Sequence, residues 1–173
     1  MTEHGSRSIW IGKVSYTAAV RRWLQNTDHY LGSAPPGCLF AVGVMQCGMG
    51  LFEDVPVGDG VLRGLCVVGR PVARGLPQDH TVGEVVRMWL QPGLPYGTAS
   101  RVLRRAADIG RARKMVALIA YHDRTRHSGC IYKKAGFRRD GVTNPSLNGW
   151  ASRPGRKSGE LPATPKRRWR LDL

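Results

Sequence analysis

The segment that most constrains the fold is MVALIAY, an unbroken apolar run at residues 115–121. Polar residues do not alternate with the apolar ones, and the run falls well short of the roughly 18 residues needed to span a bilayer. Unbroken runs of this length are typical of a strand buried on both faces, in a sheet covered by helices. The sequence therefore predicts a mixed α+β domain built around a helix-covered sheet.

The segments around this run alternate between helical and extended patterns. We expect helices over 16–26, 99–113 and 128–137, and strands over 38–45, 61–69, 81–90, 115–121 and 166–173. The first two strands are expected to form an antiparallel hairpin. Thr98 or Ser100 is the expected N-cap of the second helix. Period-two alternation in the third strand places Val86 on one face and Val85 and Arg87 on the other.

The length of 173 residues suits one domain, with residues 1–10 flexible and a basic tail over 141–173 that packs on the domain. The four cysteines have no zinc-site spacing, which favours reduced thiols. The chain begins without the apolar stretch of a signal peptide. We therefore expect a cytoplasmic protein that does not contact a membrane, and the sequence leaves open whether it is a monomer or a homodimer.

Positive charge is concentrated in the second half of the chain. Residues 1–96 have a net charge of +1, whereas residues 97–173 have a net charge of +14, out of +15 in total. Such asymmetry favours a polyanionic partner, nucleic acid before others, over a basic surface kept only for solubility.

Five stretches, found in order between residues 20 and 171, carry a resemblance to a known family: HYLGSAPPGCLFAVGV, GLCVVGRPVAR, EVVRMWLQPGLPYGTASRVL, YHDRTRHSGCIYKKAGF and WASRPGR with TPKRRWRL. Together they resemble the Mom family of bacteriophage DNA-modification proteins, a divergent group of GNAT-type acyltransferases. The resemblance implies a GNAT-like central mixed sheet flanked by helices, with an irregular basic C-terminal tail. It also implies N6-carbamoylmethylation of adenine in double-stranded DNA, which protects phage DNA from restriction.

Two residues are candidates for proton transfer at the end of the buried strand. Asp123 follows the apolar run, where sheets of this kind keep their clefts, and is the candidate general base or positioning group for an amine. Tyr132, on the following short helix, matches the position where the fold family uses a tyrosine to protonate a leaving thiolate. The simpler alternatives are a loop aspartate paired with Arg124 or Arg126, and a core aromatic.

A histidine–tyrosine pair, His29 and Tyr30, follows the first helix and matches the pair in the family. His29 is a candidate proton shuttle, and together with His127 and Asp123 it is a candidate ligand set for iron or another divalent metal. A hydrogen-bonding histidine is the plainer alternative.

The sequence does not identify the cofactor, and acetyl-CoA and another CoA thioester are the candidates. The usual Gly-rich pyrophosphate loop is replaced by GLPYGTASR, although backbone N–H groups at this helix start are able to hold an anion. The residues expected at the cofactor are Arg87, Gly97, Ser100 and Arg101.

Nucleic-acid contact is expected from basic side chains of the second half. The candidates are Arg104, Arg105, Lys133, Lys134, Arg153, Arg156, Lys157, Lys166, Arg167 and Arg168. Reaction at N6 is expected to need the adenine turned out of the duplex. Two other functions stay open: a conventional acetyl-CoA-dependent N-acetyltransferase acting on a small amine, protein or RNA, and a non-enzymatic nucleic-acid-binding protein.

Overall fold

Seven strands form one mixed sheet in the computed structural model, which describes residues 9–29, 33–35, 37–46, 61–73, 75–143 and 164–173. The strands are β1 (Ile9–Val14), β2 (Phe40–Gln46), β3 (Val61–Gly69), β4 (Val82–Leu90), β5 (Ala117–Asp123), β6 (Arg138–Thr143) and β7 (Lys166–Asp172). Their order across the sheet is β1-β2-β3-β4-β5-β7-β6. Among the described strands only β4 and β5 pair in parallel, and the other neighbours are antiparallel. The mixed sheet confirms the predicted fold class.

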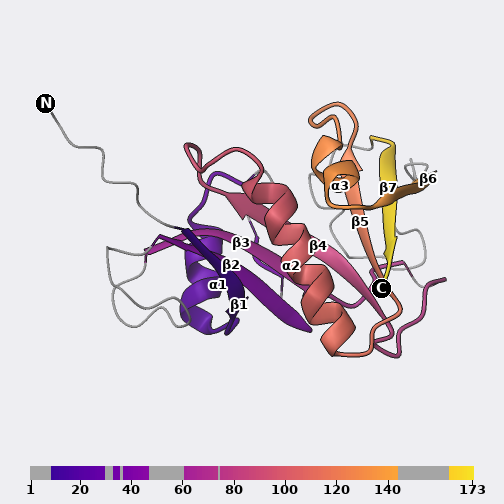
Figure 1. Cartoon of the computed structure of the whole chain (residues 1–173), viewed down its shortest axis with the longest axis horizontal. Helices are drawn as coiled ribbons and strands as arrows, with labels where there is room; N and C mark the ends of the chain where they lie inside the picture. The colour runs from indigo at the N-terminus through magenta and orange to yellow at the C-terminus, as the bar shows by residue number, and fades with distance from the viewer. Residues whose placement is uncertain (1–8, 30–32, 36, 47–60, 74, 144–163) are drawn as a thin grey trace, which may run out of the picture.

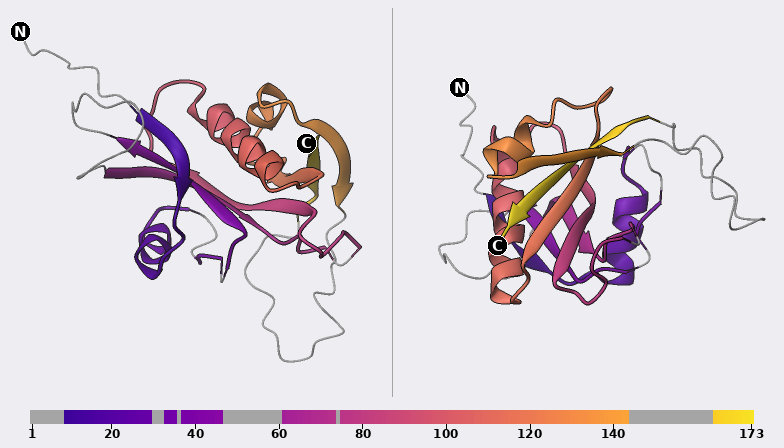
Figure 2. Two further views of the ribbon diagram at one scale, coloured as in Figure 1. Left: turned by 60° about the horizontal axis from the view of Figure 1, so that its bottom comes forward. Right: turned by 90° about the vertical axis from the view of Figure 1, so that its right-hand side faces the viewer.

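Helices cover both faces of the sheet (Figures 1 and 2). α1 (Ala18–Gln25) lies on one face, while α2 (Thr98–Ala112) and α3 (Cys130–Lys134) lie on the other. Each long helix is amphipathic, and its apolar stripe faces the sheet. No helix in the described part of the chain is long and apolar enough to cross a membrane.

The larger core lies between the sheet and the α2 and α3 layer. Leu103 of α2 and Leu118 of β5 are fully buried there, together with Tyr132 of α3 and Trp169 of β7. A smaller cluster under α1 includes Leu24, Leu65 and Val67. From Ala117 onwards the apolar run is covered as expected, because β5 lies between β4 and β7 with side chains buried on both faces. Val116, before the strand, is 52% exposed.

A β-bulge in β4 changes the expected alternation of side chains. Val67 of β3 faces Arg87, and the next residue, Val68, faces Val85, so Val86 is an extra residue in the ladder. Val85 packs in the core on the α2 side, whereas Val86 packs in the cluster on the α1 side. The predicted separation of Val86 from Arg87 was therefore wrong, because a bulge places two consecutive residues on one face.

The structure adds two edge strands that the sequence pattern did not predict. β1 begins at Ile9 and pairs with β2, and β6 follows the predicted short helix and runs into the start of the predicted tail. β5 runs two residues beyond its predicted end, so His122 and Asp123 belong to the strand. The cap of α2 also differs, since Gly97 precedes the helix with a φ of 85° and without a side-chain cap hydrogen bond.

Candidate active site

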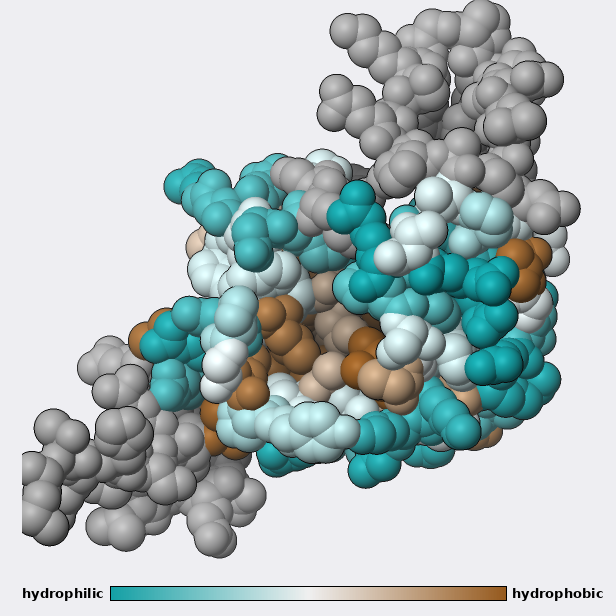
Figure 3. Space-filling view, turned by 90° about the horizontal axis from the view of Figure 1, so that it is seen from above, coloured by the Kyte–Doolittle hydropathy of each residue, from teal (hydrophilic) through white to brown (hydrophobic). Residues whose placement is uncertain are grey.

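The parallel strands β4 and β5 separate at their carboxyl ends. Their ladder joins Val82–Val85 to Ala117–Ala120 and continues no further, although both strands extend beyond these residues. A cavity of about 410 Å³ occupies the gap. Viewed from above, the face of the molecule carries a hollow with an apolar floor and a mostly hydrophilic rim (Figure 3).

Polar side chains from five parts of the chain line this cavity: His29, Arg87, Tyr121, His122, Arg126, His127, Ser128 and Tyr132. Met88 and Ile131 supply apolar walls. The sequence-predicted residues His29, Arg87, His127 and Tyr132 are thus brought together.

His122 lies at the end of β5, where only 4% of its surface is exposed. The indole N–H of Trp169 donates to its Nδ1 over 2.7 Å. Because an indole N–H is only a donor, Nδ1 carries no proton and the neutral ring carries its proton on Nε2. Burial, followed by the charges of Arg167 and His127, lowers the pKa of His122 below its ordinary value. His122 is therefore a neutral hydrogen-bond donor at neutral pH.

Tyr132 is stacked against this pair from α3. Its ring centroid lies 5.9 Å from that of His122, with planes 20° apart, and 5.6 Å from that of Trp169, with planes 22° apart. Phe137 contacts it edge-on. The side chain is 7% exposed and lines the cavity, so Tyr132 packs as a core aromatic, and its role as an acid stays a prediction.

Gly129 permits the close packing of these rings. Its φ of 76° lies in the left-handed region, and a Cβ built there would come within 2.7 Å of both His122 Cε1 and Trp169 Cζ2. Only glycine satisfies the backbone and the contact at this position.

His29 enters the cavity from the segment after α1. Burial, reinforced by the charge of Arg87, lowers the pKa of His29 to about 4. The imidazole is therefore unprotonated at neutral pH and able to accept a proton. The adjacent Tyr30 lies outside the described residues, so its predicted role stays a prediction.

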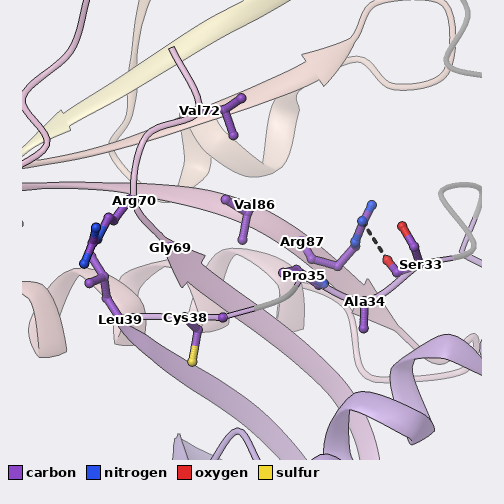
Figure 4. A pocket seen from close by; sticks show the side chains of 11 residues that line it. Ser33, Ala34, Pro35, Cys38, Leu39, Gly69, Arg70, Val72, Val86 and Arg87 are labelled. Carbon is purple, nitrogen blue, oxygen red and sulfur yellow. Dashed lines mark hydrogen bonds between the residues drawn. The ribbon is translucent and has the colours of Figure 1, made fainter. Parts of the chain in front are cut away.

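Arg87 joins this cavity to a second one. That cavity, of about 580 Å³, shares Val86 and Arg87 with the first and lies against the segment at Ser33–Pro35 and the end of β3 (Figure 4). Nη2 of Arg87 donates to the carbonyl of Ser33 over 2.8 Å. The bulge at Val86 produces this arrangement, because it turns Arg87 towards the α1 side of the sheet.

Asp123, the predicted base, does not line the cavity. It follows His122 in the strand and so points to the opposite face of the sheet. Its carboxylate accepts from Thr125 N and Oγ1 at 2.8 and 2.6 Å and from Thr164 Oγ1 at 2.9 Å, with Arg126 Nε at 3.7 Å. These contacts, Thr125 first, lower the pKa of Asp123 to about 2. The structure separates Asp123 from Tyr132 and gives the carboxylate a role in fixing the loop after β5.

The predicted metal ligands are not brought together either. His29 and His127 both line the cavity, but Asp123 does not. Within the described ranges, no three His, Cys, Asp or Glu side chains are placed to hold a metal ion. The candidate set His29, Asp123 and His127 was therefore wrong as a ligand group, because strand alternation turns Asp123 away.

The predicted cofactor residues around the start of α2 stand apart from the cavity lining. Gly97 provides the left-handed turn into the helix, Ser100 is 5% exposed in its first turn, and Arg101 is exposed. Thr98 Oγ1 donates to the carbonyl of Pro95, which closes the loop instead of capping the helix. The first-turn N–H groups of a helix favour an anion, so an anionic group at the start of α2 stays a prediction.

The candidate nucleic-acid residues fall into three groups. Arg104 donates to the carbonyl of Lys134, and Lys134 in turn bonds to the hydroxyl of Tyr96. Arg105 and Lys133 are exposed. Lys166, Arg167 and Arg168 are half-buried on β7. Arg153, Arg156 and Lys157 lie outside the described residues.

His122 was missed as a functional residue by the sequence reasoning, which placed it in a loop. Extending the predicted strand to residue 123 would have set His122 on the same face as Ala120 and opposite Asp123. Its partner Trp169 packs in the core.

The comparisons with known proteins support the fold. A putative acetyltransferase from Acinetobacter baylyi ADP1 has a TM-score of 0.62 at 13% identity, over 100% of this chain and 95% of that chain. An IAA acetyltransferase from Bacillus cereus ATCC 14579 has a TM-score of 0.58 at 14% identity, over 96% and 100%. An acetyltransferase from Bacillus subtilis in complex with CoA has a TM-score of 0.56 at 13% identity, over 96% and 99%.

No family model matches the chain, and no curated protein matches it by sequence. These structures belong to acetyltransferases, and identities this low establish fold alone. The chain therefore has a GNAT-like mixed α/β fold.

Proposed function

We propose that this protein is an N-acyltransferase that moves an acyl group from a CoA thioester to an amine. The observation that supports this most is the separation of β4 and β5 beyond Val85 and Ala120, with His29, His122 and Tyr132 around the gap. Backbone groups at the ends of both strands there are available to a ligand with peptide-like amides, such as the pantetheine arm. The similarity in fold to a Bacillus subtilis acetyltransferase described in complex with CoA points the same way.

The side chains around the gap suit the steps of acyl transfer. The amine attacks the thioester carbonyl, a C–N bond forms, and negative charge develops on the carbonyl oxygen. The Nε2–H of His122 is the donor suited to that oxygen, because its Nδ1 is occupied by Trp169. The C–S bond then breaks, and the leaving thiolate takes a proton from the hydroxyl of Tyr132.

The attacking amine must also lose a proton. His29 lines the cavity and, with a pKa of about 4, is in its unprotonated form at neutral pH. It accepts the proton as the C–N bond forms, directly or through one water. Asp123 is not assigned this step, since its carboxylate is bonded to Thr125 and Thr164 outside the cavity.

Thioester turnover tests the proposal. Thiol release from acetyl-CoA should be measured with a panel of amines, and CoA binding by calorimetry. Tyr132→Phe should lower kcat by about 10²-fold while CoA still binds, because it removes only the acid. Tyr96→Phe is the matched control, since Tyr96 is 90% exposed and outside the cavity. Absence of CoA binding to the folded wild type would overturn the proposal.

A second candidate is modification of the N6 amine of adenine in DNA, as the resemblance to the Mom family suggests. The observation that favours it is the net charge of +14 in residues 97–173, together with arginines beside the cavity. Nucleoside mass spectrometry of DNA from cells that express the chain is the test. An altered adenine that disappears in His122→Ala and Tyr132→Phe would favour this candidate, and unchanged DNA with active thioester turnover would favour another amine. DNA binding with neither activity would indicate a non-enzymatic protein.

A further inference from the structure

The β6–β7 pair distributes its arginines very differently on its two faces. On the α1 side, each arginine meets a carboxylate. Arg168 Nε lies 2.7 Å from Asp140 Oδ2, and Asp172 receives Arg170 Nε at 2.6 Å and Arg138 Nη2 at 2.9 Å. The positive charge of this face is therefore largely balanced by the protein itself.

The other face, which carries Trp169, has no such balance. Arg139 is the register partner of Trp169, and Arg167 lies two residues before Trp169, so both project on the side of α3. Arg124 follows β5 directly. Among the described residues, none of these three arginines makes a hydrogen bond or ion pair with another side chain. We call Arg124, Arg139 and Arg167 the arginine cluster.

The cluster is close enough for its members to repel one another. Burial first, and then Arg139 and Arg124, lower the pKa of Arg167 below its ordinary value. Arg167 is also the register partner of His122, and its charge contributes to the lowered pKa of that histidine. None of the three arginines lines the cavity, but Arg167 lies directly across the β5–β7 ladder from His122, which does.

We infer that the arginine cluster is a phosphate-binding site, which holds a backbone phosphodiester of a nucleic acid beside the cavity. Guanidinium groups match phosphate oxygens with paired N–H donors, and an anion between like charges relieves their repulsion. The position next to His122 would present a base of the same strand to the gap between β4 and β5. This inference concerns the acceptor side alone and does not depend on CoA being the donor.

Salt-dependent DNA binding tests this inference. Binding of the full chain to a labelled duplex and a labelled single strand should be measured by fluorescence anisotropy over a range of salt concentrations. Arg139→Gln and Arg167→Gln should each lower the slope of log K against log salt by about 0.9 on a duplex, as one lost phosphate contact does. Arg167→Lys should restore most of the slope, because it keeps the charge.

The opposite face of the same strands supplies the matched controls. Arg138→Gln and Arg170→Gln remove equal charge from the same strands but should leave the slope close to that of the wild type, because both side chains are held in ion pairs with Asp172. An equal fall of the salt-dependence slope in all four variants, or no DNA binding by the wild type, would overturn the assignment.

Calorimetry with CoA distinguishes a nucleic-acid phosphate from the phosphates of CoA as the ligand of the arginine cluster. The cluster variants should bind CoA as the wild type does. A loss of CoA affinity with DNA binding intact would assign the arginines to the phosphates of CoA and overturn the inference. If variants that no longer bind DNA still turn over the thioester, then acyl transfer does not depend on DNA binding.

Discussion

The indole N–H of Trp169 donates to Nδ1 of His122 over 2.7 Å, across two neighbouring strands that meet only in the folded chain. This bond fixes the tautomer of a buried imidazole at the edge of the cavity. The bond thereby makes His122 a hydrogen-bond donor through Nε2 and not a base, which the residue type alone does not determine. The proposed chemistry assigns His122 to the carbonyl oxygen for this reason.

Nitrogen NMR checks the tautomer. At pH 7 the ring of His122 should be neutral with its proton on Nε2. Trp169→Phe removes the donor to Nδ1, so both neutral tautomers should be populated and the pKa of His122 should rise towards its ordinary value. A proton on Nδ1 in the wild type would contradict the assignment.

Substitution of Gly129 should destabilise the site more than substitution of another left-handed glycine. Gly93 has a φ of 86° and no atom within 4 Å of a built Cβ, so Gly93→Ala should cost only the backbone strain, about 1 kcal/mol. Gly129→Ala adds the contact with His122 and Trp169 and should cost about 1–3 kcal/mol more in unfolding free energy. Urea denaturation of both variants measures the difference, and equal costs would show that the rings move aside.

The stability of the protein should depend on pH through His29. Its pKa is about 4 in the folded protein against 6.5 ordinarily. Between these values the unfolded chain binds a proton that the folded chain does not, so the unfolding free energy should fall as pH decreases from 6.5 to 4. His29→Gln should flatten this part of the curve, as measured by denaturation at each pH. An unchanged slope in the variant would assign the effect to other groups.

Asp123 should contribute to stability more than to chemistry. Its folded pKa of about 2 lies below the ordinary 3.8, so its contribution is present above pH 4 and lost as the pH falls through 2. Asp123→Asn should lower Tm at pH 7 and weaken this acid dependence, whereas Thr164→Val, which removes one of its hydrogen bonds, should lower Tm less. Full stability of Asp123→Asn with abolished turnover would instead restore the base that the sequence predicted.

Much of the fold could be predicted from sequence because it rests on local patterns. The apolar run at 115–121 became the covered strand β5, the helical spacing at 99–113 became α2, and the short helix ends before Gly136, whose φ is 94°. The two edge strands were missed because each is only six residues long and partly exposed, and because β6, RRDGVT, is mostly polar. Their pairing comes from neighbours distant in the chain.

The sequence by itself determined the class of the fold, the concentration of positive charge, and the set of residues near the end of β5. Only the tertiary structure decided which of them face one another. An extra residue at Val86 turned Arg87 to the α1 side, and two further residues of strand sent His122 and Asp123 to opposite faces. Side-chain direction in a sheet reverses with every residue, so an error of one position in register moves a side chain from the face with the site to the opposite face.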